Sequence, residues 1–197
     1  MPQSNAKNAQ KIISLGVTLF IITVVTGLIL GVVHDVTLEP IRLTQERLKA
    51  EALRGVLPDA EEFRTVEKVQ KTEDAGPIVI DVQQALAGGK TLGYCLTVAS
   101  RGYGGTIELA AGITNDGKLR GIRILNHSET PGLGAKSEEK DFYEQFRDSD
   151  KVTVVKREPA APGEIMAISG ATITSTAVAD GVNAALEYWR GYLAEGE

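Results

Sequence analysis

Cysteine is almost absent from this chain of 197 residues, which contains Cys95 and no other. A single cysteine excludes an internal disulfide, and it excludes any zinc or iron–sulfur site built from this chain's cysteines alone. Cys95 could still contribute to a site shared with a partner. Because free cysteines usually behave as small buried hydrophobic residues, we expect Cys95 to lie in a strand as part of a core.

Runs of basic residues are also missing: no stretch of five or more Lys or Arg occurs, and the net charge is −5. Binding to a phosphate backbone needs a concentrated positive surface, so we expect no nucleic-acid partner. Aromatic residues make up only 5% of the chain, whereas glycine occurs 21 times, which predicts many tight turns and few bulky core side chains. No G-x-G-x-x-G fingerprint is present, so nicotinamide chemistry is expected to belong to a partner.

The long apolar run lies near the amino terminus. Residues 12–33 carry no charged side chain, and a helix of that length, rising about 1.5 Å per residue, crosses a hydrocarbon core of about 30 Å. A cleaved signal peptide is the alternative, but the run exceeds an ordinary apolar region of about 7–15 residues and no A-x-A-like site follows it. Lys7 and Lys11 precede the run, whereas Asp35 and Glu39 follow it. This asymmetry predicts a cytoplasmic amino terminus, with the rest of the chain outside.

Four segments follow from this pattern. We expect a cytoplasmic tail at 1–11, a transmembrane helix at 12–33, a membrane-proximal helix and linker at 34–75, and an outer domain at 76–197. In the third segment, residues 44–54 are rich in helix formers and predict a helix leading out of the membrane.

The outer domain has the patterns of paired strands. We predict one hairpin from 77–83 and 91–99, and a second from 106–114 and 118–125. Asn-Asp-Gly at 115–117 supplies the positive-φ residues that the second reversal needs.

Shorter elements complete the outer domain. Further strands are expected at 66–69 and 151–156, and a short helix at 137–146. A final helix is expected to begin with Thr174 or Ser175 as its cap and to end near Leu193. Strands followed by helices in this way define an α+β fold, with antiparallel hairpins and packed helices after one transmembrane helix.

The residues best suited to hold a phosphate are Ser-Gly-Ala-Thr-Ile-Thr-Ser-Thr at 169–176. They lie between a predicted strand region and a predicted helix start, where free N–H groups and the positive end of the helix dipole favour an anion. Gly170 and Ala171 keep side-chain bulk away from the backbone there. A turn rich in Ser and Thr that caps its own helix, with no ligand, explains the same residues equally well.

Three motifs, together with the amino-terminal run, carry a family resemblance. They are Arg-Gly-Tyr-Gly-Gly at 101–105, Asn-His-Ser-Glu-Thr-Pro-Gly-Leu-Gly-Ala-Lys at 126–136, and Ser-Gly-Ala-Thr followed by Ile-Thr-Ser at 169–175. The sequence resembles the FMN-binding G subunit of the Rnf ion-translocating ferredoxin:NAD oxidoreductase complexes. It is also similar to the C subunit of sodium-pumping NADH:quinone oxidoreductase. The resemblance covers essentially the whole chain, and the motifs occur in the family order.

The resemblance implies an electron-transfer subunit of a translocase in the cell (inner) membrane. The implied partners are the other subunits of such a complex, A, B, C, D and E, and no independent substrate turnover is expected. Other functions stay open: a stand-alone extracytoplasmic flavoprotein that reduces small acceptors, an unflavinylated scaffold, or a membrane-anchored binding module.

The resemblance also implies a covalent cofactor. In the family, FMN is esterified through its phosphate to the last Thr of the Ser-Gly-Ala-Thr motif by a separate flavin transferase, and the matching residue here is Thr172. The neighbouring residues expected at the phosphate end are Ser169, Gly170, Ala171, Thr174 and Ser175. The family often has an acidic residue six positions before the modified Thr, where this chain has Met166. Modification could therefore be slow, or could depend on Glu164 instead.

Two further groups of residues are expected around the flavin ring, where a protein binds, orients and tunes its cofactor. Gly104 and Gly105 could bring backbone N–H groups to ring or ribityl oxygens, although a tight inter-strand turn explains these glycines too. The Pro/Gly loop at 127–135 is expected to wall the flavin, since loops of this kind are often functional. The residues assigned to this wall are Glu129, Thr130, Leu133 and Gly134, with Leu133 packing on the ring and Thr130 bonding its edge.

Two cationic or titratable residues lie in the same region. Lys136 could neutralise a reduced flavin, or could be solvated beside Glu138 and Glu139. His127 could donate a proton near the flavin, or could be simply hydrogen-bonded within the protein. No second histidine accompanies it in the outer domain, so we expect no metal site.

Overall fold

The computed structural model describes residues 3–66 and 76–194. The chain consists of two compact units, Met1–Arg47 and Leu48–Glu197. Of the strand expected at 66–69, residues 67–69 lie outside the described residues, and the strand seen nearby is β1, Glu62–Thr65.

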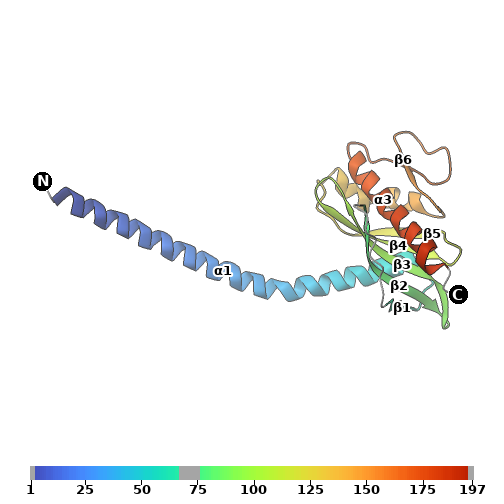
Figure 1. The fold of residues 1–197 in the computed structure, drawn as a ribbon, viewed down its shortest axis with the longest axis horizontal. Coiled ribbons are helices and arrows are strands. Elements are labelled where there is room, and N and C mark those ends of the chain that lie inside the picture. The colour runs from blue at the N-terminus through green and yellow to red at the C-terminus, as the bar shows by residue number, and fades with distance from the viewer. Residues whose placement is uncertain (1–2, 67–75, 195–197) are drawn as a thin grey trace. The chain divides into compact units, whose positions relative to one another are not determined.

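The first unit is formed by α1, a helix that spans Gln3–Val56 and therefore also enters the second unit (Figure 1). From Ile13 onward it is long and apolar enough to cross a membrane, and the rest of the chain does not cover its most apolar part. The helix joins the expected anchor and the expected membrane-proximal helix without a break, and Pro40 lies inside it. Arg42 pairs with Glu39 and Glu46 one turn away on either side, and such pairs support a helix across an exposed segment.

A five-stranded antiparallel sheet is the centre of the second unit, with the strand order β1-β2-β3-β4-β5. Its other strands are β2 (Ile78–Ala87), β3 (Lys90–Arg101), β4 (Thr106–Thr114) and β5 (Leu119–Asn126). Both predicted hairpins are confirmed, since β2 pairs with β3 and β4 pairs with β5. Gly117 has φ +77°, as the reversal between β4 and β5 requires.

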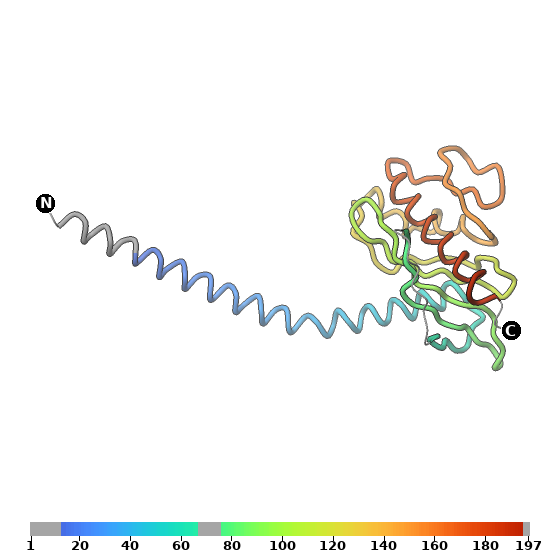
Figure 2. Tube along the Cα trace, viewed as in Figure 1, coloured from blue at the N-terminus to red at the C-terminus, as the bar shows by residue number. Residues whose placement is uncertain are grey.

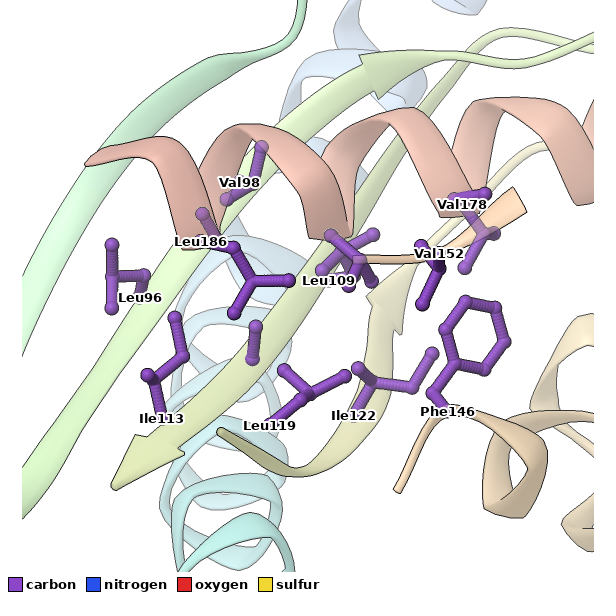
Figure 3. Close-up of a cluster of buried hydrophobic side chains, with 14 of the residues drawn as sticks. Leu96, Val98, Leu109, Ile113, Leu119, Ile122, Phe146, Val152, Val178 and Leu186 are labelled. Atoms are coloured by element: carbon purple, nitrogen blue, oxygen red, sulfur yellow. The ribbon is translucent and has the colours of Figure 1, made fainter. Parts of the chain in front are cut away.

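The sheet is covered on both faces within the second unit. Helix α3 (Thr172–Tyr188) packs on one face, where its Leu186 lies among buried strand side chains that include Leu96, Val98 and Leu109 (Figure 3). Successive strand residues point to opposite faces, so Cys95 and Ala110 face the other way. There they pack with Ala52, Leu53 and Val56 in the last turns of α1, and with Leu57 just after it.

The segments after β5 are short. They are η1 (Gly134–Glu138), α2 (Lys140–Tyr143), η2 (Glu144–Phe146), β6 (Thr153–Val155) and β7 (Glu164–Met166), and η3 (Trp189–Leu193) extends α3 as a π-helical turn. The strand predicted at 151–156 is confirmed as β6. The single helix expected at 137–146 is wrong, because Glu139 is extended, with ψ 144°, and divides the segment. Strand β7, parallel to β6, was not predicted, since three residues carry too little pattern.

Three segments gather at one end of the sheet: the turn at 102–105 between β3 and β4, the loop at 127–139, and the start of α3 (Figure 2). They come from distant parts of the sequence. Because α3 and the sheet are joined by a continuous buried core, they hold these segments in fixed positions.

Burial predicts the reactivity of Cys95. The side chain is 1% exposed, and burial raises the pKa of its thiol to about 12. Since the thiolate is the reactive form, we expect no reaction with a maleimide at neutral pH while the chain is folded, and full reaction after denaturation. Rapid labelling of the folded protein would contradict this packing.

Candidate functional site

The site lies where α3 begins, after a tight turn. The N–H of Ala171 donates to the carbonyl of Ile168 at 2.9 Å, and Gly170 within this turn has φ +78°. This left-handed conformation suits glycine, and a Cβ there would also lie 3.1 Å from Cδ2 of Leu133. Thr172 is the first helical residue, and the first N–H groups of a helix have no partner within it.

No side chain caps this helix start. Ala171 occupies the cap position without a side-chain hydrogen bond, and the first turn has no acidic residue. The prediction that Thr174 or Ser175 caps the helix was wrong, because both lie inside it and both hydroxyls are used elsewhere. The Ser175 hydroxyl donates to the carbonyl of Ala171 and accepts the N–H of Ile168, both at 3.0 Å. The positive end of α3 is therefore left for another anion.

Thr172 is half-buried and, like Gly170, lines two hollows at the helix start. We call the first the lysine hollow. It has a volume of about 520 Å³, and its lining includes Lys136, Lys156, Met166, Ser169 and Gly170. The second, the tyrosine hollow, has a volume of about 600 Å³ and is lined by Tyr103, Thr130, Leu133, Ile173 and others. Either volume lies within the range of ordinary cofactor sites.

A buried carboxylate ties the three segments together. Glu129 is only 5% exposed, its Oε1 accepts the N–H of Gly104 at 2.9 Å, and its Oε2 accepts the hydroxyl of Thr174 at 2.6 Å. Hydrogen bonds to a charged acceptor are stronger than those between neutral groups. Glu129 therefore holds the 102–105 turn and the start of α3 in place, in addition to lining the tyrosine hollow.

The glycines around Glu129 permit this close packing. A Cβ at Gly134 would lie 2.5 Å from Oε2 of Glu129, and one at Gly104 would lie 2.1 Å from the carbonyl oxygen of Ser128. The N–H of Gly104 is already bonded to Glu129, and the carbonyl of Gly105 accepts the N–H of Gly102 at 2.8 Å. Neither Gly104 nor Gly105 is among the described residues that line the two hollows. The structure thus places them in a tight inter-strand turn, the alternative considered from the sequence.

His127 contacts a residue of the 127–139 loop through each of its two ring nitrogens. Its Nδ1 accepts the N–H of Glu129 at 3.0 Å, and its Nε2 lies 3.2 Å from Oε1 of Glu138. Because Nδ1 accepts, we assign the ring proton to Nε2, the nitrogen that faces Glu138. The ring is 13% exposed, and His127 is not among the described residues that line the two hollows. Its contacts with Glu129 and Glu138 instead help to order the loop.

Lys136 lines a different hollow from the residues expected to wall the flavin. It is exposed and lines the lysine hollow together with Glu139, whereas Thr130 and Leu133 line the tyrosine hollow. Lys156, just after β6, brings a second positive charge to the lysine hollow. Nothing in the sequence around Lys156 distinguished it from an ordinary surface lysine.

Met166, at the position where the family often has an acid, is 45% exposed and lines the lysine hollow. Glu164 is instead engaged by Arg157, with N–O distances of 2.8 and 2.6 Å, and by the N–H of Ala160. The hydrogen bonds from Arg157 hold the pKa of this carboxyl below its usual range. Among the described residues that line the two hollows, Glu164 does not occur.

Two lining residues of the tyrosine hollow were not assigned from the sequence. Tyr103 is 71% exposed and Ile173 is 56% exposed, beside Leu133 at 43%. The position of Tyr103 within the Gly-Tyr-Gly-Gly motif was the available signal, whereas Ile173 resembles any apolar residue of a helix. Exposed apolar side chains that gather around a hollow are typical of a binding site.

These features fit FMN. An uncapped helix start suits a phosphate, and a neighbouring hollow with apolar walls suits a flat aromatic ring. Thr172, which carries a hydroxyl and lies at both, is placed to connect the two ends of such a ligand. Among the described residues, no cluster of His, Cys, Asp and Glu suits a metal ion.

Comparisons with known proteins give the class of the domain. Residues 102–187 match the family model of the FMN-binding domain. A crystal structure of the C subunit of Na(+)-translocating NADH-quinone reductase from Parabacteroides distasonis superposes with a TM-score of 0.54 at 24% identity, over 70% of this chain and 80% of that one. The fold and the site thus define an FMN-binding domain of the α+β class.

Two curated relatives identify the family more closely. The chain is 35% identical over 183 residues to the G subunit of the proton-translocating ferredoxin:NAD(+) oxidoreductase complex of Clostridium ljungdahlii, covering 92% of this chain and 93% of the relative. It is 33% identical over 186 residues to the G subunit of the ion-translocating oxidoreductase complex of Methanosarcina acetivorans, covering 94% and 96%. The chain belongs to the family of G subunits of ion-translocating oxidoreductase complexes. With its apolar helix, this membership makes it a membrane protein.

Proposed function

We propose that this chain is the electron-transfer G subunit of a membrane-bound ferredoxin:NAD oxidoreductase complex, in which FMN redox chemistry is coupled to Na⁺ or H⁺ translocation. The single observation that carries the proposal is the position of Thr172, at an uncapped helix start between two hollows within an FMN-binding domain. The relatives are named as subunits of complexes of this kind, which supports the same partners here.

The FMN is covalent in this proposal, with its phosphate esterified to the Thr172 hydroxyl by a separate flavin transferase. Hydrogen bonding within the first turn of α3 supports this choice. The hydroxyls of Thr174 and Ser175 are both bonded, whereas within residues 3–66 and 76–194 the Thr172 hydroxyl has no such partner. Of the threonines and serines in that turn, Thr172 is therefore the one whose hydroxyl can form the ester without breaking a hydrogen bond of the folded chain.

Each part of the site has a separate role toward the bound cofactor. FMN, when bound, supplies the ability to pass one or two electrons. The free N–H groups at the start of α3 bind the phosphate, and Lys136 and Lys156 offset its negative charge. Leu133 and Ile173 exclude water from the ring, and Glu129 fixes the segments that carry these side chains. A covalent link retains the cofactor outside the cytoplasm, where lost FMN cannot be replaced from the cellular pool.

The proposed topology has one span, a cytoplasmic amino terminus and an external FMN domain. Because Cys95 is buried, new cysteines can report on sidedness. We expect a membrane-impermeant maleimide to label Glu158→Cys, an exposed position of the second unit, in sealed right-side-out vesicles. We expect it to label Ser4→Cys only after the vesicles are permeabilised. Labelling of Ser4→Cys in sealed vesicles would contradict this orientation.

Purification from native membranes tests membership of a complex. A tagged chain is expected to copurify with the other membrane subunits and to be reduced when electrons enter through a partner. Isolation of the flavin-bearing chain alone, with direct reduction of small acceptors, would replace this proposal with a stand-alone reductase.

A further inference from the structure

Tyr103 is an aromatic side chain that the folded protein leaves in water. It is 71% exposed, and no other large hydrophobic side chain among the described residues is more exposed. Burying an aromatic ring contributes substantially to stability, so an exposed one on a fixed segment indicates a surface that is completed by something else.

The turn that carries Tyr103 is fixed. The N–H of Gly102 donates to the carbonyl of Gly105 at 2.8 Å, and the N–H of Gly104 donates to Glu129 at 2.9 Å. Glu129 in turn accepts the Thr174 hydroxyl on α3. Tyr103 is therefore anchored, through two hydrogen bonds to one buried carboxylate, to the same helix turn that bears Thr172.

The surroundings of Tyr103 match one face of a flat ring system. Tyr103, Leu133 and Ile173 are all exposed apolar groups, and all three line the tyrosine hollow of about 600 Å³ with Thr172. Among the described residues that line either hollow beside Thr172, Tyr103 is the only Tyr or Trp. The lysine hollow has four charged side chains in its lining, Lys136, Glu139, Asp141 and Lys156, beside Phe142 and Met166. Among the described residues that line the tyrosine hollow, Glu129 alone is charged, so the tyrosine hollow is the more apolar of the two.

We propose that Tyr103 stacks on the isoalloxazine ring of FMN in the tyrosine hollow and positions the ring there, with Leu133 and Ile173 as the aliphatic walls. This inference rests on the proposed function, because it needs flavin on Thr172. Offset stacking is the favoured arrangement of aromatic pairs. The lysine hollow then receives the phosphate end, so the two hollows divide the cofactor between them at Thr172.

Stacking by a phenol has a spectroscopic consequence that a purely structural role lacks. A photo-excited flavin takes one electron from a phenol in contact with it and then returns that electron. Emission is lost, and neither group is oxidised overall. Phenylalanine can stack but is a much poorer electron donor, whereas tryptophan is a good one. The fluorescence lifetime of the bound flavin therefore reports on the side chain at position 103.

The test uses the full-length chain, produced with a flavin transferase and purified from membranes in detergent. Time-resolved fluorescence is compared for the unsubstituted chain, Tyr103→Phe and Tyr103→Trp, with flavin content taken from absorbance after denaturation. Tyr192→Phe is the matched control, because Tyr192 is also exposed but lies twenty residues beyond Thr172, roughly 30 Å along the helix.

We expect a short lifetime for the unsubstituted chain and for Tyr192→Phe, a severalfold longer one for Tyr103→Phe, and a return to the short value for Tyr103→Trp. Equal lifetimes in the unsubstituted chain and Tyr103→Phe, at equal flavin content, would overturn the stacking and leave the proposed function standing. Absence of covalent flavin from all of these proteins would overturn the proposed function and this inference with it.

Discussion

Replacing Thr172 with valine is expected to abolish covalent flavin while the chain still folds and inserts into the membrane. Valine keeps the shape of threonine but lacks the hydroxyl that the ester requires. Thr172 is only half-buried and its hydroxyl has no hydrogen-bond partner among the described residues. The free energy of unfolding should therefore change by no more than about 0.5 kcal/mol, as for most substitutions away from special features. In-gel flavin fluorescence of the denatured protein measures the loss.

The matched control is Thr176→Val, which removes an exposed hydroxyl one turn further along the same helix. This variant should retain full flavin fluorescence. In an intact complex, Thr172→Val should assemble with its partners but stop electron flow through this subunit. A complex that carries Thr172→Val and still transports electrons would show that the subunit is a scaffold.

Replacing Glu129 with alanine is expected to have the largest effect on stability within the site. The substitution leaves the buried hydroxyl of Thr174 without its acceptor, and it also removes the hydrogen bond that holds the exposed Gly104. Leaving one buried polar group unpaired costs about 1–3 kcal/mol, so we expect a loss of about 2 kcal/mol in the free energy of unfolding. The single tryptophan, Trp189, lies in the π-helical turn that extends α3, and its fluorescence during denaturant unfolding in detergent measures the change.

Two variants separate the loss of the Glu129 hydrogen bonds from the general effect of removing a negative charge. Glu187→Ala removes an exposed carboxylate from α3 and should change stability by no more than about 0.5 kcal/mol. Thr174→Val removes one of the two donors to Glu129 and should cost less than Glu129→Ala. Equal stabilities for Glu129→Ala and Glu187→Ala would contradict the role assigned to the buried carboxylate.

Local patterns in the sequence predicted the elements that depend on local chemistry. Alternating apolar residues and Asn115-Asp-Gly117 were sufficient for the hairpin of β4 and β5, because the turn and the strands both act over a few residues. The apolar run was sufficient to predict a helix able to cross a membrane, because that ability depends on the length and composition of the run itself.

The start of α3 was predicted incorrectly because its hydroxyls are used by distant partners. Thr174 has the side chain of a good cap, but Glu129 lies 45 residues earlier in the sequence and accepts its hydroxyl in the folded chain. Once Thr174 is drawn inward, the helix begins at Thr172 with Ala171 at the cap. The resulting uncapped helix end is the feature that suits a phosphate. Tertiary contacts, and no local sequence pattern, produce this uncapped end.

The role of Glu129 and the separation of the two hollows were equally inaccessible from the sequence. An acid in a Pro/Gly loop is usually solvated, and only the fold shows that Glu129 is 5% exposed. Lys136 follows Leu133 and Gly134 closely in the chain, but it lines a different hollow from theirs. The assignment of Thr172 came from the resemblance, and it stays a prediction that the geometry supports.

The most direct test of that assignment is the intact mass of the denatured full-length chain, followed by fragmentation of the peptide that contains residues 169–176. The chain is expected to carry the mass of one FMN less one water, with the phosphate located on Thr172. An unmodified mass from cells that possess a flavin transferase, or an adduct located on Ser169 or Thr176, would contradict the proposed site.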